Sequence, residues 1–511
     1  MSSHQIVIIG TGFSGLGMGI QLRKAGITDF VILEQNDDLG GTWHENHYPG
    51  CACDVQSALY SFSFEQKPDW SREFAPQAEI KAYLKHCAEK YGLLPHIHLN
   101  THVATARYSE QDRQWQLQTC DSAAMWAYKT QKGLKPGDPV DPEDPDLPSM
   151  ASMSAQVVVA GVGGLSTPAY PDIPGLETFT GKQFHSQNWD HSYDLTGKRV
   201  AVIGTGASAI QFVPQIAKQA ARVDLYQRTP PWIVPKPDRR LSERRKSLFR
   251  RHPTLMKSYR SLVYWLLEAR ALGFVAHPKI LKMAQGIAHR HIRNQIDDPG
   301  LRQQVTPDFH FGCKRVLISN DYYPALTQDN VQLITDGIAS VTSTSVVDQQ
   351  GGAREVDCLI YGTGFRAQEP MPRGMIFGRG GQDLLDAWAE GAEAYKGTTV
   401  SGFPNLFILM GPNTGLGHNS MVYMIESQIR YVMGALEVMK QNNWQALDVR
   451  TSEQQAYNQD LQGRLENTVW QTGCRSWYLN ENGRNTTLWP GYTWRFRQRT
   501  RQFDPSAYNV E

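Results

Sequence analysis

Two short runs of apolar residues, far apart in the chain, are each followed by glycines and then by apolar positions at helical spacing. The first run is Gln5–Ile9 and the second is Lys198–Ile203. Continuous apolar runs of this length are typical of parallel strands buried on both faces. A second apolar run follows each helix, at Phe30–Leu33 and at Arg222–Tyr226. The pattern therefore predicts two separate strand–turn–helix–strand units, each the start of a dinucleotide-binding fold.

The first glycine turn has the spacing G-x-G-x-x-G and runs from Gly10 to Gly15. Glycines at these positions let backbone N–H groups approach a pyrophosphate at the helix N-terminus. The next strand ends in Glu34, where a carboxylate would hold a ribose diol and repel a 2′-phosphate. A strand–helix turn that binds nothing is the alternative interpretation. The residues of this unit predicted to contact a dinucleotide are Gly10, Gly12, Ser14, Gly15 and Glu34.

The second glycine turn, G-x-G-x-x-A, runs from Gly204 to Ala209. Arg228 follows Gly204 by 24 residues, the interval that also separates Gly10 from Glu34. A guanidinium pairs with a 2′-phosphate, so this unit predicts NADP, unless Arg228 is simply a solvated residue at a strand end. The opposite charges imply FAD in the first unit and NADPH in the second. The predicted NADP contacts here are Gly204, Thr205, Gly206, Ser208, Ala209, Arg228 and Thr229.

Two motifs between and within these units resemble one known family. The segment Phe179–Asp190 has the pattern F-x-G-x-x-x-H-x-x-x-W-D, and Gly40–Asp54 has the pattern G-G-x-W-x-x-x-x-Y-P-G-x-x-x-D. Both resemble hallmarks of the Baeyer–Villiger monooxygenases, a branch of the class B flavoprotein monooxygenases, and the resemblance extends over almost the whole chain. For an isolated fingerprint, a surface linker with packed aromatics would be the alternative.

The resemblance implies further contacts with FAD. In this family the loop matching Gly40–Asp54 lies against the isoalloxazine, and its final Asp reaches the reaction centre. The implied additional FAD contacts are Thr42, Trp43, Asp54, Tyr60, Val103 and Met421.

A second set of residues is implied at the reaction centre. Lys314-Arg315, followed by Asp321-Tyr-Tyr, resembles the family segment that bears the catalytic arginine. Arg315 is then the catalytic cation, which also contacts NADP, and Asp54 orients and partly neutralises it. Lys314 would join Arg228 on the 2′-phosphate. Trp477 is implied beside the nicotinamide, with core packing as the alternative.

The implied chemistry explains why an arginine is needed. In the family, O₂ adds to reduced flavin to give a C4a-peroxyflavin, which attacks a ketone. A permanently charged guanidinium stabilises the peroxide anion and the later adduct without giving up its proton. We therefore expect an FAD-containing, NADPH-consuming monooxygenase that inserts one oxygen atom of O₂ beside the carbonyl of a small ketone, giving an ester or lactone.

Three other functions remain as alternatives. A nitrogen- or sulfur-oxygenating flavin monooxygenase would lack the Trp189-Asp190 ending and the Asp54/Arg315 pair. A disulfide reductase would need a redox C-x-x-x-x-C soon after Glu34, whereas Cys51 and Cys53 have the wrong spacing. A nucleotide-sensing binding protein would bind NADPH without consuming oxygen.

The motifs together predict an α/β fold with two Rossmann-like domains. The FAD-binding domain would comprise residues 1–175 and 376–511, including a C-terminal cap. The NADP-binding domain would comprise residues 176–375, with a helical insertion at about 236–305. Within the insertion, the apolar run Leu262–Leu267 favours core or interface packing over a membrane-facing helix. The Pro-, Gly- and Asp-rich segment 132–147 is expected to form no core element.

Composition narrows the setting. A chain of 511 residues predicts two or three domains. With 51 Lys and Arg against 50 Asp and Glu, no strong overall field attracts nucleic acid or an anionic membrane. The basic cluster 239–251 is interpreted as a solvated helix face.

Neither a signal peptide nor an apolar run long enough for a membrane span is recognisable. Seven cysteines, an odd number in a long chain, argue against a disulfide framework and suggest a reducing cytoplasm. His44 and His47 lack a third ligand at useful spacing, so no metal site is expected. We expect a cytoplasmic monomer or weak homo-oligomer.

Overall fold

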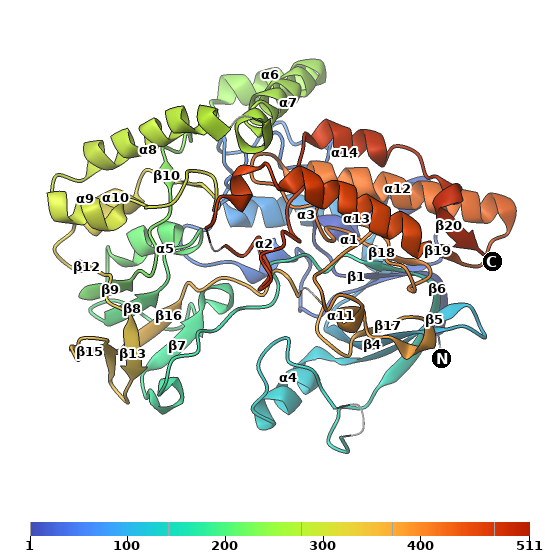
Figure 1. Cartoon of the computed structure of the whole chain (residues 1–511), viewed down its shortest axis with the longest axis horizontal. Coiled ribbons are helices and arrows are strands. Elements are labelled where there is room, and N and C mark those ends of the chain that lie inside the picture. The colour runs from blue at the N-terminus through green and yellow to red at the C-terminus, as the bar shows by residue number, and fades with distance from the viewer. Residues whose placement is uncertain (1, 142–143, 277, 370, 475) are drawn as a thin grey trace.

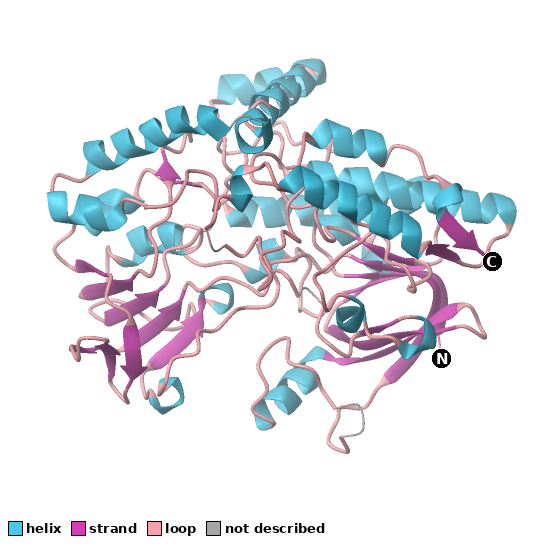
Figure 2. Ribbon diagram, in the orientation of Figure 1, coloured by secondary structure: helices cyan, strands magenta, loops and turns pink. Residues whose placement is uncertain are grey.

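The protein has two sheets that lie side by side, with most of its helices along one side of them. The structure is a computed structural model, which describes residues 2–141, 144–276, 278–369, 371–474 and 476–511. Figure 1 follows the chain through these parts, and Figure 2 shows the strands gathered in two groups below the helices. The α/β class with two dinucleotide-binding units is therefore confirmed.

The first sheet has eight strands in the order β17-β4-β5-β6-β1-β2-β3, with β18 paired to β6. The strands are β1 (Ser2–Ile9), β2 (Phe30–Leu33), β3 (Ile97–His98), β4 (Thr101–Ser109), β5 (Gln114–Asp121), β6 (Ala151–Ala160), β17 (Ile376–Phe377) and β18 (Leu406–Ile408). β4, β5 and β6 form an antiparallel meander. Because β6 also pairs in parallel with β1, meander and parallel strands form one sheet.

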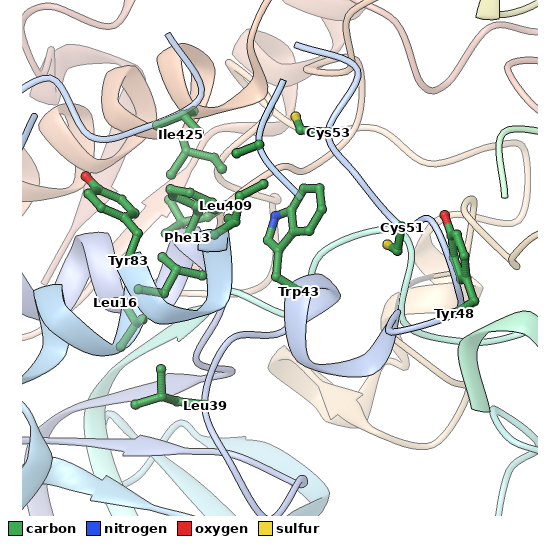
Figure 3. Close-up of a cluster of buried hydrophobic side chains, with 14 of the residues drawn as sticks. Phe13, Leu16, Leu39, Trp43, Tyr48, Cys51, Cys53, Tyr83, Leu409 and Ile425 are labelled. Atoms are coloured by element: carbon green, nitrogen blue, oxygen red, sulfur yellow. The ribbon is translucent and has the colours of Figure 1, made fainter. Parts of the chain in front are cut away.

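Helix α1 (Phe13–Lys24) leaves the first glycine turn and packs against α12 (Met421–Asn442), which comes from the far end of the chain. The approach is close, because a Cβ at Gly17 would lie 2.9 Å from the Ile429 side chain. Figure 3 shows the apolar cluster in which Phe13 and Leu16 meet Ile425 of α12 and Tyr83 of α3 (Gln77–Lys90).

The second sheet has five parallel strands in the order β12-β9-β8-β16-β7. They are β7 (Lys182–His185), β8 (Arg199–Ile203), β9 (Arg222–Tyr226), β12 (Val331–Ile334) and β16 (Cys358–Tyr361), and α5 (Ala209–Ile216) follows β8. A small antiparallel sheet of β13 (Ile338–Val341), β14 (Ser345–Asp348) and β15 (Ala353–Glu355) adjoins it. The segment Phe179–Asp190, called the fingerprint segment below, therefore contains β7. It contributes an edge strand to this sheet and is not merely a linker.

The stretch expected to be a helical insertion is helical. It contains α6 (Glu243–Arg251), α7 (Pro253–Glu268), α8 (Leu281–Gln295) and α9 (Pro299–Val305). Core packing holds for only part of the run Leu262–Leu267: Val263, Tyr264 and Leu267 are buried, whereas Leu262, Trp265 and Leu266 are 55–60% exposed. Among the described residues, no helix combines the length and apolarity needed to cross a bilayer.

The remaining elements are short or lie near the surface. The helices are α2 (Thr42–Glu45), α4 (Ser122–Gln131), α10 (Tyr322–Leu326), α11 (Leu384–Ala387), α13 (Thr451–Leu465) and α14 (Thr493–Arg499); the strands are β10 (Ile233–Val234), β11 (Leu317–Ile318), β19 (Leu447–Val449) and β20 (Tyr508–Val510). The described part of the Pro-rich segment 132–147 has no helix or strand, as predicted. It is nevertheless held against α4, because Lys132 pairs with Asp144 and Asp146 and apolar residues of the segment pack on Tyr128.

Gly181 of the fingerprint segment provides a test of why that motif needs a glycine. A Cβ there would lie 2.7 Å from the Asp357 carbonyl oxygen and 2.5 Å from the ring of Phe179, which is buried. We expect Gly181→Ala to lower the free energy of unfolding by about 2 kcal/mol, measured by urea denaturation.

Gly463→Ala is the matched control, because Gly463 lies within helix α13 and nothing stands within 4 Å of the added Cβ. Alanine favours a helix over glycine, so this change should raise the free energy of unfolding by up to about 1 kcal/mol. Equal effects of the two substitutions would contradict the packing argument.

Candidate active site

The first glycine turn forms a backbone cradle at the start of α1. Gly10 has a φ of +98° and its N–H donates to the Leu33 carbonyl over 2.7 Å. Gly12 is the N-cap residue of α1, which has no side-chain cap and no acidic residue in its first turn. A Cβ on Gly41 would lie 2.9 Å from the Cα of Gly12, so the loop before α2 closes tightly over the turn. The N–H groups of the helix end are thus free to hold an anion.

Glu34 ends β2 with a carboxylate that is fixed in place, 4% exposed. Its Oε2 accepts hydrogen bonds from the Thr11 N–H and hydroxyl over 2.9 and 2.6 Å. Its Oε1 accepts from the Asn36 N–H and side-chain amide over 3.0 and 2.8 Å. Val103, buried on β4, lies two residues after Thr101, whose N–H donates to the Glu34 carbonyl. The acid predicted to face a ribose is therefore beside the glycine turn.

The second glycine turn repeats this geometry. Gly204 has a φ of +104°, its N–H donates to the Tyr226 carbonyl, and a Cβ there would lie 2.5 Å from the Gly362 oxygen. Helix α5 begins at Ala209 after Ser208, without a side-chain cap or an acid in its first turn. Thr205 donates its hydroxyl hydrogen to the Thr229 carbonyl over 3.3 Å, which joins the glycine turn to the end of β9. This helix end is also a site for an anion.

Two cations lie together beside the second turn. Arg228 follows β9, and Lys314 comes from the loop before β11. Burial lowers the pKa of Lys314 and the nearby charge of Arg228 lowers it further, whereas the charge of Asp308, which forms no ion pair with Lys314, opposes both. Within the described part of the chain, neither residue has an ion-pair partner. Two neighbouring cations without paired carboxylates fit a dianionic phosphate, which would neutralise their mutual repulsion.

Asp54 and Arg315 form an ion pair between segments 261 residues apart in the chain. The Arg315 Nη2 donates to the Asp54 Oδ2, with the side chains 38% and 31% exposed. Burial alone would raise the pKa of Asp54, but the charge and hydrogen bond of Arg315 outweigh it and lower that pKa. The carboxylate in turn raises the pKa of Arg315. Both groups are therefore charged across the physiological pH range.

Tyr60 lies near the Asp54–Arg315 pair: burial raises the pKa of Tyr60, and the charges of Asp54 and Arg315 act on that pKa in opposite directions. The Trp43 Nε1 donates to the Tyr60 hydroxyl over 3.3 Å, and the two rings stand edge to face with centroids 5.6 Å apart. Figure 3 shows Trp43 between the apolar cluster around Phe13 and the loop that carries Cys51 and Cys53. Thr42 and Trp43 begin α2 directly after Gly41, which lies against the first glycine turn, and the Trp43 side chain is buried.

The C-terminal segment reaches the site through a residue that the sequence analysis missed. Tyr478 is 1% exposed, burial raises its pKa to about 12, and the charge of Arg315 opposes that rise. Trp477, the predicted residue, is 43% exposed and its ring packs on that of Tyr478. Met421 begins α12 and packs at the edge of the cluster that contains Tyr478. The composition of this segment does not indicate which of its two neighbouring aromatic side chains is buried.

Lys236 is a second residue that sequence analysis missed. Burial lowers its pKa, whereas the charges of Asp238 and Asp54 oppose that shift. Its own charge contributes to the lowered pKa of Asp54. The backbone N–H of Lys236 donates to the side-chain carbonyl of Asn320, which lies between β11 and α10, over 2.9 Å. A lysine between two prolines carries no motif that would have identified it.

A disulfide joins the arginine loop to the C-terminal segment. Cys313, directly before Lys314, is bonded to Cys474 across 161 residues, with Cα atoms 6.3 Å apart. The odd number of cysteines had argued against disulfides, so one such bond corrects that expectation. The remaining cysteines are free and buried: Cys51, Cys53, Cys87, Cys120 and Cys358. The bond fixes the two segments that flank Arg315 and Tyr478 relative to each other.

The fingerprint segment connects the second sheet to the loop of the first. The Gln187 side-chain amide donates to Glu45 of α2 over 2.9 Å and to the Ser166 carbonyl over 2.7 Å. Trp189 is buried against Phe184 and Phe212. These contacts explain in physical terms why the motif carries its aromatic residues, and Glu45 and Gln187 are positioning residues that the sequence did not reveal.

Two further hydrogen bonds join the same parts. The Tyr48 hydroxyl donates to the Gln211 side-chain oxygen of α5 over 3.0 Å. His47 and His191 share a hydrogen bond of 2.8 Å between Nδ1 and Nε2. Both tyrosine and histidine belong to the loop expected against a flavin, so this loop is anchored on α5 and on the end of the fingerprint segment.

Comparison with known proteins points to one class of protein. Residues 148–374 match the family model for flavin-binding monooxygenase-like proteins, and residues 8–75 match that for NAD(P)-binding Rossmann-like domains. These partial matches are consistent with a flavin-binding monooxygenase, and full-length relatives decide the class.

Individual relatives define the family. The chain is 55% identical to a Baeyer–Villiger monooxygenase of Pseudomonas aeruginosa, over 99% of this chain and 91% of that protein. It is 42% identical to a Baeyer–Villiger monooxygenase of Streptomyces coelicolor, over 99% and 92% of the two chains. The solved structure of OTEMO in complex with FAD and NADP has a TM-score of 0.84 at 26% identity, covering 99% of each chain. The chain therefore belongs to the Baeyer–Villiger monooxygenase family, as the resemblance predicted.

Glu45 makes stability depend on pH. Burial and then the charge of Glu34 raise the pKa of Glu45 to about 7. Between pH 4.5 and 7 the native state holds a proton that the unfolded chain releases, so stability falls as pH rises. We expect Glu45→Gln to raise the free energy of unfolding, relative to that of the unaltered protein, by about 2 kcal/mol more at pH 8 than at pH 5, as measured by urea denaturation.

Glu243→Gln is the control for this prediction. A hydrogen bond from Lys246 lowers the pKa of the Glu243 carboxyl, so this carboxylate is ionised in the native state from pH 5 to 8. Its replacement should therefore have the same effect at both pH values. A pH-independent effect of Glu45→Gln would contradict the assignment of a proton to Glu45.

Proposed function

We propose that the chain is an FAD-containing, NADPH-consuming Baeyer–Villiger monooxygenase that inserts one oxygen atom of O₂ beside the carbonyl of a small ketone, giving an ester or lactone. The Asp54–Arg315 ion pair carries this proposal, because Asp54 belongs to the unit with the first glycine turn and Arg315 to the unit with the second. Membership of the family and the solved complex of OTEMO with both cofactors support it. The same features favour ketone oxygenation over nitrogen or sulfur oxygenation.

The residues present fit FAD at the first turn. The uncapped end of α1 suits a pyrophosphate, and the fixed carboxylate of Glu34 suits a ribose. FAD, when bound, accepts hydride from NADPH and activates O₂, which no side chain can do. The residues that we assign to it are Gly10, Gly12, Ser14, Gly15, Glu34, Thr42, Trp43, Asp54, Tyr60, Val103 and Met421.

The residues present also fit NADPH at the second turn. The uncapped end of α5 suits the pyrophosphate, and the paired cations Arg228 and Lys314 suit the 2′-phosphate, which NADH lacks. The residues that we assign to it are Gly204, Thr205, Gly206, Ser208, Ala209, Arg228, Thr229, Lys314, Arg315 and Trp477.

Arg315 is assigned as the catalytic cation. Its guanidinium offers a fixed positive charge to an oxygen atom that gains negative charge during the reaction, and it does so without donating its proton. Asp54 orients the guanidinium through their hydrogen bond. Tyr60 and Tyr478 lie close enough for the charges of the pair to act on their pKa values, so they add aromatic surface beside the guanidinium.

The organisation of the chain follows from these assignments. We propose an FAD domain of residues 1–175 and 376–511, because β17, β18 and α12 complete the first sheet and its cover. Residues 176–375 form the NADP domain, with the helical insertion at about 236–305. We further propose a cytoplasmic protein that is a monomer or weak homo-oligomer, because five of its seven cysteines are free and buried and Cys313–Cys474 is an isolated bond rather than part of a disulfide framework.

Replacing Arg315 tests the catalytic assignment. We expect Arg315→Ala to lower the rate of ester formation by at least about a thousandfold, because the charge that stabilises the developing oxyanion is lost. Reduction of the bound flavin by NADPH should continue. It is measured in the absence of oxygen as the loss of the yellow absorbance of the flavin. Arg373→Ala is the control, since Arg373 pairs with Asp386 at the surface. Ordinary ester yield from Arg315→Ala, measured by product mass, would refute the assignment.

Replacing Arg228 tests the cofactor assignment. Removing a guanidinium from a phosphate contact should raise the KM for NADPH by about tenfold to a hundredfold while leaving that for NADH unchanged. The measurement is the ratio of kcat/KM for the two nucleotides. Arg113→Ala, at an exposed site paired with Glu511, should leave the ratio as it is. An unchanged preference for NADPH in Arg228→Ala would contradict the assignment.

A further inference from the structure

The outward side of helix α7 carries an apolar stripe without charge. Its members and their exposed fractions are Leu255 (46%), Leu262 (55%), Trp265 (58%) and Leu266 (60%). Residues 255, 262 and 266 recur at intervals that place them on one helical face. The opposite face, with Val263 and Leu267, is buried in the protein. An exposed stripe of this kind marks an interaction surface.

Helix α8 presents a second stripe of the same kind. Ile280, Met283 and Ile287 are 43%, 78% and 53% exposed and follow one another at intervals of three and four residues. Figure 1 shows α6 and α7 at the top of the molecule and α8 along its upper edge, all on the side away from the two sheets. We call the exposed residues of α7 and α8 named here, with the basic residues that flank them, the insertion face.

The part of the chain that contains α7 and α8 is strongly basic. Between residues 244 and 293 the chain has twelve Lys and Arg and a single acid, Glu268, whereas the remainder of the chain is acidic by ten. Glu268 is 1% exposed and accepts hydrogen bonds from Thr493 and Asn419, so it does not offset the surface charge. Among the described residues, the following exposed cations of the segment have no ion-pair partner: Arg244, Arg251, Lys257, Arg270, Lys279, Lys282, Arg290 and Arg293.

We propose that the insertion face docks on an anionic lipid surface, with its apolar side chains entering the interface and its cations meeting lipid phosphates. Apolar stripes with a Trp, flanked by Lys and Arg, are the features that hold a helix in the plane of a membrane surface. The segment contributes a charge of +11 to a chain of +1, so attraction to anionic headgroups is local. The mode is peripheral, which agrees with the lack of a spanning helix among the described residues.

Charge also decides between a lipid surface and a second copy of the chain. In a symmetric dimer through this face, the insertion face of one copy would contact the insertion face of the other. The unpaired cations of both copies would therefore face each other. Like charges held together oppose such contact, whereas anionic headgroups neutralise them. The lipid surface is thus the occupant whose charge is complementary.

Vesicle binding of the FAD-loaded protein tests this proposal. We expect the protein to sediment with vesicles of phosphatidylglycerol and phosphatidylcholine in equal parts, and to bind vesicles of phosphatidylcholine alone at least about tenfold more weakly. High salt should weaken the binding, since it screens exposed charges. Two triple variants should each weaken binding to the anionic vesicles by about tenfold or more: Leu262→Ser with Trp265→Ser and Leu266→Ser, and Lys257→Glu with Lys282→Glu and Arg290→Glu.

Matched controls lie elsewhere on the surface. Trp126→Ser removes another exposed Trp, 49% accessible on α4, and Lys218→Glu with Lys440→Glu reverses two exposed cations outside the insertion. Both controls should bind vesicles like the unaltered protein, and all variants should keep their NADPH oxidation. Equal binding to both vesicle types, or no binding, would overturn the proposal. So would concentration-dependent dimers in sedimentation velocity that the Leu262/Trp265/Leu266 variant abolishes, because the occupant would then be a second copy.

Discussion

The arrangement of the whole molecule depends on one ion pair between its two halves. Asp54 follows the loop after α2, whereas Arg315 stands before β11, and no local structure brings them together. A guanidinium that lost its carboxylate would keep its charge but not its direction, and a half-buried charge without a partner is costly. The segments on both sides must therefore be held closely, and the structure holds them by different kinds of bond.

The bonds that hold these segments come from three parts of the chain. The disulfide Cys313–Cys474 ties the arginine loop to the C-terminal segment. Gln187 and Gln211 tie the loop before Asp54 to the second sheet and its helix α5. The fingerprint motif, which in sequence resembles a label of the family, thus contributes the edge strand β7 and, shortly after it, Gln187, whose hydrogen bond to Glu45 anchors α2 and the loop before Asp54. The motif therefore acts on this loop through packing and hydrogen bonds.

The sequence predicted those features that follow from local pattern. Glycine turns, their strands and the charges of Glu34 and Arg228 could be located because spacing along a strand and the φ angles of Gly10 and Gly204 are local properties. The pairing of Asp54 with Arg315 came from resemblance to a family and not from spacing. Features that depend on tertiary contacts were missed, namely the disulfide, Lys236, Tyr478 and the Glu45–Gln187 contact. Trp477 and Tyr478 differ by one position, and only folding shows which ring is buried.

Net charge was the least informative quantity for the same reason. A value of +1 averages a strongly basic insertion with an acidic remainder, and the two lie in different places on the folded chain. An electrostatic field acts over about 10 Å at ordinary salt, so a partner responds to the charges within that distance and not to the sum. The apolar run Leu262–Leu267 shows the same effect for hydrophobicity: half of it supports the core and half faces outward. In a chain of this size, the charge and exposure of one helix face therefore determine what that surface can bind, and averages over the whole chain do not.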